Sequence, residues 1–374
     1  MRWTIIKARD ALFQPPEVLM IKVAIVGASG YAGCELVRLL SCHPNVMLTH
    51  LYVSEQSADA HKAISLVSGK LYGLCSLTLE PLSYAAAALL TSEDADVIFM
   101  ATDHKVSHDL APVFLENGIA VIDLSGAFRI SDPQLFSQYY GFELGSAQQE
   151  LLKERVYGLV DWVKFEHLQT ARLISMPGCY PTASELALKP LMAAKLLDCS
   201  MPPVINAVSG VSGAGRKAKL SNSFCEVSLN AYGLFNHRHL IEIEEQVGTK
   251  VIFNPHLGNF KRGILATITA RLKIGTTKEQ VALAYEHAYL KCNQNSSHEF
   301  NTLVRVKNDT VKLQDVQYTP FCDLSYQLEE SSRVEQGPYI VISSAIDNVL
   351  KGAASQAVEA MNIHFGLPRS RSLL

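Results

Sequence analysis

The sequence predicts an α/β protein, in which a Rossmann-type doubly wound parallel sheet is joined to a second domain of the α+β class. Strand-like and helix-like segments alternate through the first half of the chain, which is typical of parallel sheets. From Cys179 onward the periodicity becomes less regular, as expected for a mixed or antiparallel sheet that carries helices on one side. The length of 374 residues exceeds one ordinary core and favours two domains.

The first predicted unit is a strand, a glycine-rich turn and a helix. Residues 22–26 form a short β-branched run, and the turn at 27–33 has the spacing G-x-x-G-x-x-G rather than the usual G-x-G-x-x-G. In this context the glycines let a pyrophosphate approach the backbone at the helix N-terminus. The alternative is a glycine turn that caps the helix and binds nothing. The residues expected to bind a dinucleotide here are Gly27, Ser29, Gly30, Tyr31 and Gly33.

A second strand is expected at residues 47–53. Rossmann proteins that prefer NAD usually place Asp or Glu at the end of this strand, where it holds the ribose 2′-hydroxyl. Here the strand ends in Ser54, and Glu55 comes one step late. Because a serine hydroxyl can hydrogen-bond a 2′-phosphate, the segment favours NADP, but it does not decide between NADP and NAD.

Further β and α segments complete the predicted parallel sheet. Strands are expected at 96–101 and 120–124, with a helix at 104–117 between them. Arg129 follows the second of these strands, near the carboxyl edge of the sheet where ligands bind. A guanidinium there suits a carboxylate or phosphate, and an ordinary surface arginine is the alternative.

Composition excludes several classes of protein. The hydrophobic fraction of 48%, the charged fraction of 18% and the formal net charge of -3 are those of a globular domain. No block of like charges suggests a nucleic-acid or membrane partner. The eight cysteines include no C-x-x-C pair, and His104 and His108 lack an evident third ligand, so we expect no metal site and interpret both histidines as solvated.

The N-terminal segment carries no targeting pattern. Residues 1–19 lack a continuous apolar run, and we interpret them as an extension upstream of a working start at Met20, a weak transit segment being the alternative. Without a secretory signal, a cytoplasmic location is expected.

The sequence of the second half of the chain predicts three strands and two helices. Thr276 and Glu279 match a capping box that begins the first helix, and the alanine-rich segment 348–362 predicts a second helix that packs back on the first domain. The expected strands lie at 250–253, 264–272 and 339–346. The predicted division is an extension at 1–19, a dinucleotide-binding domain at 20–176, a catalytic domain at 177–347 and a C-terminal helical segment at 348–374.

Cys179, within Pro-Gly-Cys-Tyr-Pro-Thr at 177–182, is the candidate nucleophile. Thr182 and Glu185 match a capping box, which predicts a helix that starts just after the thiol. Free N–H groups and the helix dipole would then lower the thiol pKa and supply the thiolate. A thiolate beside a dinucleotide suggests an enzyme that passes an acyl group through a thioester and transfers hydride to or from it.

Two polar clusters follow Cys179. The loop at 209–218 is not a Walker A motif, but Arg216 and Lys217 in it can hold an anionic substrate; a plain surface loop is the alternative. His237 and His239 point to one face if their segment is extended, and a neutral imidazole near the thiol can act as acid/base. Arg238 and Glu242 lie beside these histidines and make a functional cluster the favoured interpretation.

Together these segments resemble the N-acetyl-gamma-glutamyl-phosphate reductases, over about residues 20–366. Two features depart from the family: the extension before Met20, and Ser54-Glu55 where the family often has Ser-Arg. The segments that carry the resemblance are 27–33, 123–129, 177–182, 209–217, 237–239, 255–267 and 348–354.

The resemblance implies a catalytic domain of the glyceraldehyde-phosphate and aspartate-semialdehyde dehydrogenase type. It implies NADPH-dependent reduction of N-acetyl-gamma-glutamyl phosphate in arginine biosynthesis, with Cys179 as nucleophile and His237 as acid/base, His239 being the alternative. Asn348 falls in the last cofactor-side segment. The expected substrate-binding residues are Arg129, Arg216, Lys217, His239 and Glu242.

Other functions stay open at this point. A reductase of another acyl phosphate, such as aspartyl phosphate, would share these motifs. A non-catalytic NADP-binding sensor would keep the glycine turn without needing Cys179, and a cofactor-free cysteine hydrolase would need no dinucleotide at all. A homo-oligomer, either dimer or tetramer, is the expected assembly.

Overall fold

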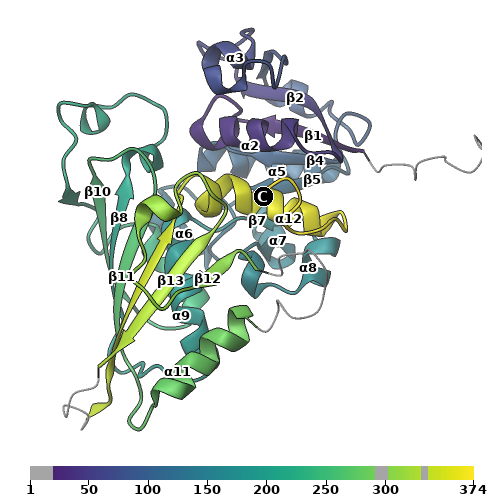
Figure 1. The fold of residues 1–374 in the computed structure, drawn as a ribbon. Helices are drawn as coiled ribbons and strands as arrows, with labels where there is room; N and C mark the ends of the chain where they lie inside the picture. The colour runs from purple at the N-terminus through teal and green to yellow at the C-terminus, as the bar shows by residue number, and fades with distance from the viewer. Residues whose placement is uncertain (1–19, 291–301, 330–335) are drawn as a thin grey trace, which may run out of the picture.

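The structure, a computed structural model, describes residues 20–290, 302–329 and 336–374 (Figure 1). The described chain contains two seven-stranded sheets, the first from the N-terminal half and the second from the C-terminal half. The extension predicted at residues 1–19 lies outside the described residues.

The first sheet has the order β3-β2-β1-β4-β5-β7-β6, and every neighbouring pair in it is parallel. The predicted doubly wound parallel sheet is therefore confirmed. The chain leaves β1 towards β2 on one side and returns to β4 on the other, so the carboxyl ends of β1 and β4 form the switch point where α/β sheets bind ligands. Its strands are β1 (Ile21–Val26), β2 (Val46–Ser54), β3 (Leu79–Leu82), β4 (Val97–Met100), β5 (Ala120–Asp123), β6 (Val156–Tyr157) and β7 (Leu173–Ser175).

Helices cover both faces of this sheet, because alternate side chains of its strands enter different cores. Val23 and Ile25 pack into the core under α2 and α12, whereas Ala24 and Val26 pack into the core under α5. This alternation follows from the period of two residues along a strand, and burial on both faces explains why β1 is almost wholly apolar. The helices of this half are α2 (Tyr31–Ser41), α3 (Ile64–Val67), α4 (Tyr84–Ala87), α5 (His104–Glu116), α6 (Pro133–Tyr140), α7 (Ser146–Glu154) and α8 (Phe165–Thr170).

The second sheet is mixed and carries its helices on one side, as predicted. Its order is β12-β13-β14-β11-β8-β10-β9, in which only β8–β10 and β12–β13 are parallel pairs among the described strands. α9 packs against β11 and β14, and α10 and α11 pack against α9. The elements are α9 (Cys179–Ala193), β8 (Val204–Gly210), β9 (Asn230–Ala231), α10 (His239–Val247), β10 (Ile252–Gly258), β11 (Ile264–Arg271), α11 (Lys278–Tyr285), β12 (Val304–Val306), β13 (Cys322–Leu328) and β14 (Tyr339–Ile346).

Two helix starts differ from the predictions. α11 is capped by Thr277, whose side chain accepts from the Gln280 N–H, so the capping box lies one residue later than Thr276 and Glu279. The C-terminal segment begins as a π-helical turn, η9 (Leu350–Ala354), before α12 (Ser355–His364). α12 packs against α2 and α8 of the first half (Figure 1).

A buried ion cluster joins the two sheets. Arg262, in the connection between β10 and β11, donates from Nη1 to Glu35 Oε1 of α2 at 2.7 Å and from Nε to Asp347 Oδ2 at 2.6 Å. All three side chains are buried. Because a buried charge is costly unless it is paired, this cluster fixes α2 relative to the end of β14.

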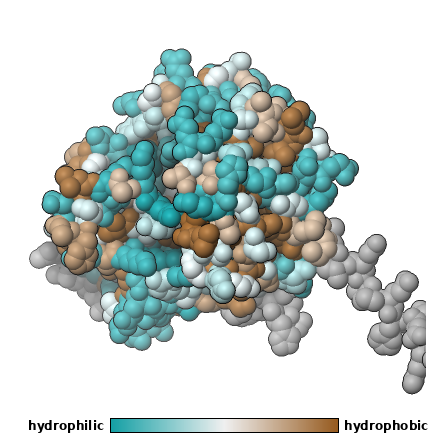
Figure 2. All heavy atoms as spheres, turned by 90° about the horizontal axis from the view of Figure 1, so that it is seen from above, coloured by the Kyte–Doolittle hydropathy of each residue, from teal (hydrophilic) through white to brown (hydrophobic). Residues whose placement is uncertain are grey.

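The surface seen from above is dominated by hydrophilic atoms, with hydrophobic atoms in scattered groups (Figure 2). Within the described part of the chain, no helix combines the length and the apolar character that crossing a bilayer requires.

Candidate active site

Cys179 is the first residue of α9, not a residue ahead of it. Gly178 is the N-cap, so the predicted Thr182–Glu185 capping box is wrong. The Thr182 hydroxyl donates back to Gly178 O at 2.9 Å, and the Glu185 carboxyl is buried elsewhere, against Tyr157. The sequence did not indicate this start, because a glycine N-cap leaves no side-chain signature.

The environment of Cys179 disfavours the thiolate form of its side chain. Burial raises the pKa of the Cys179 thiol to about 11, although Arg129 and the Tyr180 backbone N–H act to lower it. The predicted depression of the thiol pKa is therefore wrong: the helix terminus acts in the expected direction, but desolvation outweighs it. The side chain is nevertheless partly exposed, so a ligand can reach it.

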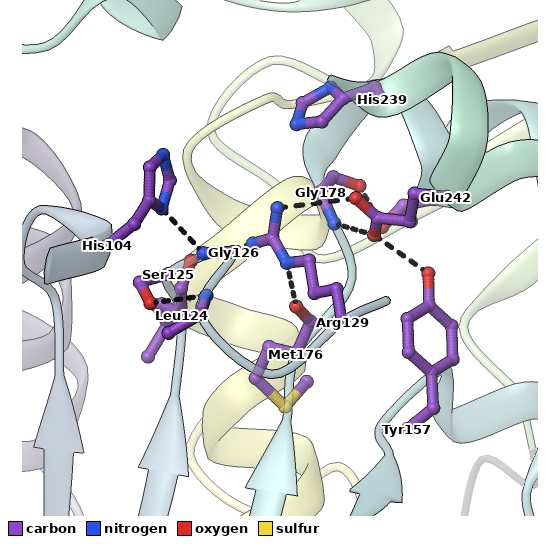
Figure 3. Close-up of polar contacts among 12 residues, drawn as sticks. His104, Leu124, Ser125, Gly126, Arg129, Tyr157, Met176, Gly178, His239 and Glu242 are labelled. Carbon is purple, nitrogen blue, oxygen red and sulfur yellow. Dashed lines mark hydrogen bonds and ion pairs between the residues drawn. The ribbon is translucent and has the colours of Figure 1, made fainter. Parts of the chain in front are cut away.

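His239 lies directly over the turn that precedes the thiol (Figure 3). α10 begins at His239, so the histidine segment is not extended as considered above. A Cβ added to Gly178 would stand 2.5 Å from His239 Nε2, which shows how tightly the imidazole packs on this glycine. Burial, followed by the neighbouring His237, lowers the pKa of His239 well below its usual value.

His237 occupies a different environment. Its Nδ1 accepts the backbone N–H of His239 at 3.1 Å, and its ring contacts Tyr180, Tyr232 and Phe253 edge-on. Burial lowers the pKa of His237 to about 4. Of the two imidazoles, His239 is the one packed on the glycine before Cys179, and His237 orders the start of α10.

Arg129 and Glu242 hold the turn before Cys179 from below (Figure 3). Arg129 donates from Nε to Met176 O and from Nη2 to Leu124 O, each at 2.7 Å. Its Nη1 faces Glu242 Oε2 at 3.5 Å, and Glu242 Oε1 accepts the Gly178 N–H at 2.7 Å. Arg129 is buried rather than a surface arginine, and a substrate contact for either residue stays a prediction.

His104 is a site residue that the sequence reasoning missed. It is the first residue of α5, and its Nδ1 accepts the Gly126 N–H at 2.7 Å (Figure 3). Burial lowers its pKa to about 3, so the ring is neutral with its proton on Nε2. The interpretation of both histidines as solvated is wrong, since His108 is buried and His104 is half-buried. The position of His104 just after β4, at the carboxyl edge, was the available signal.

The glycine-rich turn lies at the switch point of the first sheet. Gly27 has φ +87°, and a Cβ there would stand 2.3 Å from Ala101 O after β4, so only glycine fits. A Cβ on Gly33 would meet Gly27 O at the same distance. The first-turn N–H groups of α2, at Tyr31 and beyond, lack partners within the helix and can receive a phosphate. These residues therefore fit a dinucleotide, with Ser54 at the exposed end of β2.

Arg216 connects the second half of the chain to that turn, whereas Asn348 bonds to residues of the second half. Asn348 is buried; its Oδ1 accepts the Gly263 N–H at 2.7 Å and its Nδ2 donates to Ser212 Oγ at 3.0 Å. Arg216 Nη1 donates to Ser29 O at 3.0 Å and to Asp59 Oδ2 at 2.8 Å. Both partners of Arg216 belong to the N-terminal half of the chain. The structure therefore does not bring Arg216 together with Arg129 and Glu242. Lys217 is exposed.

No group of three or more metal-ligating side chains able to hold an ion occurs among the described residues.

Two family models match the chain. The NAD-binding domain of semialdehyde dehydrogenases matches residues 22–171, and the semialdehyde dehydrogenase dimerisation domain matches residues 179–348.

Curated relatives match over nearly the whole chain. N-acetyl-gamma-glutamyl-phosphate reductases from Vibrio vulnificus, Pasteurella multocida and Yersinia pseudotuberculosis are 50%, 52% and 53% identical to it. Each alignment covers 356 residues, which is 95% of this chain and 100% of the relative.

Solved structures of lower identity share the fold. Aspartate semialdehyde dehydrogenase II from Vibrio cholerae, complexed with ASA, superposes with a TM-score of 0.66 at 15% identity, over 93% of this chain and 98% of that one. Aspartate semialdehyde dehydrogenase with NADP from Candida albicans gives 0.63 at 16% identity, over 94% and 99%. The predicted fold type of the catalytic domain is thereby confirmed.

Proposed function

Since the chain belongs to the N-acetyl-gamma-glutamyl-phosphate reductase family, we propose that Cys179 is the nucleophile that carries the acyl group. The enzyme reduces N-acetyl-gamma-glutamyl phosphate with NADPH to N-acetyl-glutamate semialdehyde and phosphate, a step of arginine biosynthesis. One observation supports the proposal for Cys179 most strongly: it begins α9, and Gly178 directly before it packs on the His239 imidazole and donates its N–H to Glu242.

The first step is attack of the Cys179 sulfur on the acyl carbon. Because the thiol pKa is raised to about 11, few molecules hold a free thiolate near neutral pH, and a base must take the proton during the attack. We assign that role to His239, whose neutral imidazole packs on Gly178. The sulfur–carbon bond forms as the carbon–oxygen bond to phosphate breaks, which leaves a thioester.

The second step converts the thioester to the aldehyde. NADPH held by the turn at residues 27–33 would supply the hydride that reduces the thioester carbonyl. We assign stabilisation of the resulting oxyanion to the backbone N–H of Cys179, at the start of α9. Collapse of the thiohemiacetal breaks the carbon–sulfur bond and releases the semialdehyde. His239 then returns to the Cys179 sulfur the proton that it took in the first step. The assignment of the acid/base to His237 stays a prediction. The His237 ring is packed against three aromatic rings, which favours His239 as the base.

We assign cofactor binding to the turn of Gly27, Ser29, Gly30, Tyr31 and Gly33, with Ser54 and Asn348 as further cofactor-binding residues. The close packing of Gly27 on Ala101 and the free N–H groups of the α2 N-terminus support this placement. Arg129, Arg216, Lys217, His239 and Glu242 stay proposals as substrate-binding residues, and cytoplasm stays a prediction for the location.

We also propose that the enzyme is a homo-oligomer, a dimer or a tetramer. The segment between β8 and α10 lies within the matched dimerisation domain and exposes several large apolar side chains. A second copy of the chain would remove these side chains from water. They are Leu220, Phe224, Leu229 and Phe235.

A phosphate-dependent assay run in the oxidative direction tests the function. N-acetyl-glutamate semialdehyde, NADP and phosphate are expected to give NADPH absorbance with the wild-type enzyme and with Cys199→Ala, an exposed cysteine control. Cys179→Ala is expected to give essentially none, and arsenate is expected to replace phosphate, as acyl transfer from a thioester requires. Equal turnover of aspartate semialdehyde would instead favour the aspartyl-phosphate alternative, and full activity of Cys179→Ala would overturn the proposal.

A further inference from the structure

Two buried carboxyl groups share one tyrosine beneath the proposed nucleophile. Tyr157 Oη lies 2.9 Å from Glu185 Oε1 and 2.9 Å from Glu242 Oε1. Both glutamates are fully buried. Glu242 in turn accepts the Gly178 N–H (Figure 3), so the three side chains lead from the middle of α9 to the residue before Cys179.

A phenol has a single proton, so it can donate to only one of the two carboxyl groups. The other contact, at hydrogen-bond distance, needs a proton from the carboxyl side. If both carboxyls were ionised, one carboxylate would face the phenol oxygen with no hydrogen between them, and two negative charges would lie together in a buried site. One of the two glutamates must therefore be a carboxylic acid.

The partners decide which one it is. Glu242 accepts the Gly178 N–H at 2.7 Å and faces the Arg129 guanidinium at 3.5 Å, and both contacts stabilise a carboxylate. Among the described residues, Glu185 Oε1 has only Tyr157 as a partner, and Glu185 Oε2 has no hydrogen-bond partner.

The remaining charged neighbour of Glu185 is Lys189, one turn along α9. Its Nζ donates to Gln246 O at 2.7 Å and lies over the Trp162 ring. Among the described residues it forms no ion pair with Glu185. Burial, and next the Glu242 charge, raise the pKa of Glu185 well above its usual value, whereas Lys189, Tyr157 and Arg129 act to lower it.

We propose that Glu185 is a neutral carboxylic acid in the working enzyme, and that it positions the nucleophile through Tyr157 and Glu242. Glu185 donates to the phenol oxygen, the phenol donates to the Glu242 carboxylate, and that carboxylate holds the Gly178 N–H. The role in catalysis rests on the proposed function of Cys179; the protonation state does not.

The consequence concerns charge under the thiol. With Glu185 neutral, the single negative charge of Glu242 is balanced by Arg129, and Glu242 is the negative group that acts to raise the thiol pKa. A second charge at Glu185 would add to that effect and make the thiolate still harder to form. A neutral Glu185 therefore avoids a further rise in the thiol pKa, so that the base can still take the thiol proton.

Infrared spectroscopy of the full-length protein at pH 8 measures the protonation state directly, because exposed carboxylates are ionised there. The wild type is expected to show the carbonyl stretch of a protonated carboxyl group, and Glu185→Gln is expected to lose it. Glu150→Gln, which removes an exposed glutamate of α7, is the matched control and is expected to keep it. A Glu185→Gln spectrum with the band unchanged would overturn the proposal, whether or not Cys179 is the nucleophile.

The pH profile of Cys179 alkylation tests the positioning role. Because glutamine is neutral, Glu185→Gln is expected to leave the apparent pKa of the thiol unchanged, whereas a fall in that pKa would show that Glu185 had been charged. Tyr157→Phe removes the hydrogen bonds that link Glu185 to Glu242 without changing the charge. It is expected to lower kcat about tenfold at an unchanged KM, the loss expected for a hydrogen bond to a charged group. It is also expected to move the Glu185 carbonyl band, since the acid loses its acceptor. A wild-type kcat and an unmoved carbonyl band in Tyr157→Phe would refute the proposed hydrogen-bond series from Glu185 to Glu242.

Discussion

Replacement of Gly178 by alanine perturbs the contact between the nucleophile turn and its proposed base. The Gly178 backbone has φ -66° and ψ 158°, a conformation that alanine adopts without strain. The added methyl would stand 2.5 Å from Nε2 and 2.9 Å from Cδ2 of His239. The substitution therefore acts on the imidazole rather than on the backbone.

The size of the effect follows from that distance. Ordinary contacts lie at about 3.5 Å or more, so the His239 ring must retreat by roughly 1 Å. A displacement of that size at a catalytic group can cost about 100-fold in rate. We therefore expect kcat to fall about 100-fold, and the free energy of unfolding to fall by about 1–3 kcal/mol from overpacking.

The phosphate-dependent assay measures this loss, with urea unfolding as the stability readout. Gly69→Ala is the matched control, because a Cβ at Gly69 meets no atom within 4 Å; it should keep wild-type kcat and stability. If Gly178→Ala were as active as Gly69→Ala, His239 would not be fixed against the nucleophile turn, and its assignment as base would be wrong.

Three further predictions concern the buried charges. Arg262→Met leaves Glu35 and Asp347 without their shared cation and should cost about 3–5 kcal/mol in urea unfolding; a loss under about 1 kcal/mol would contradict the role of the cluster. The rate of Cys179 alkylation by iodoacetamide in the ligand-free enzyme should keep rising up to about pH 11, and a plateau near pH 8 would show an unperturbed thiol. Because the pKa values of His104 and His239 are lowered in the folded state, the unfolded chain binds protons below about pH 6.5 that the folded chain does not. Stability should therefore fall as the pH drops from 6.5 towards 4, by up to about 1.4 kcal/mol per pH unit for each histidine; equal urea midpoints at pH 7.5 and 5.5 would be inconsistent with buried neutral rings.

The fold was largely predictable because its signals are local. The β-branched run at 22–26, the glycine turn and the helix at 104–117 each lie in one stretch of chain, and the structure has β1, the turn and α5 there. The mixed sheet was also predicted, since strands at 264–272 and 339–346 pair directly as β11 and β14. The division of the chain into domains at 176 and 347 stays a prediction.

The site was predictable in its residue types but not in its contacts. Cys179, His239 and Glu242 were all singled out, yet their arrangement depends on which of them are buried together. Burial outweighs the effect of a helix terminus on the pKa of the Cys179 thiol. Arg129, for which a surface arginine was the alternative interpretation, is buried and donates to Met176 O. Neither result can be predicted from the spacing of residues in the local sequence, because both depend on burial in the folded chain.

Residues that act at long range were missed for the same reason. Tyr157 and Glu185 are 28 residues apart in sequence, and nothing near either residue marks it as part of a polar chain. Arg216 was assigned to substrate from its loop, whereas it reaches Ser29 across 187 residues. Only the packing of the two halves brings such pairs together.

Acylation of the enzyme without NADPH tests the thioester itself. Wild-type enzyme mixed with N-acetyl-gamma-glutamyl phosphate in the absence of NADPH should release phosphate in a burst of about one equivalent per active site, as expected when a covalent intermediate accumulates. Peptide mass mapping should then place the acyl group on Cys179. A burst that persists in Cys179→Ala, or an acyl group on any other residue, would contradict the account.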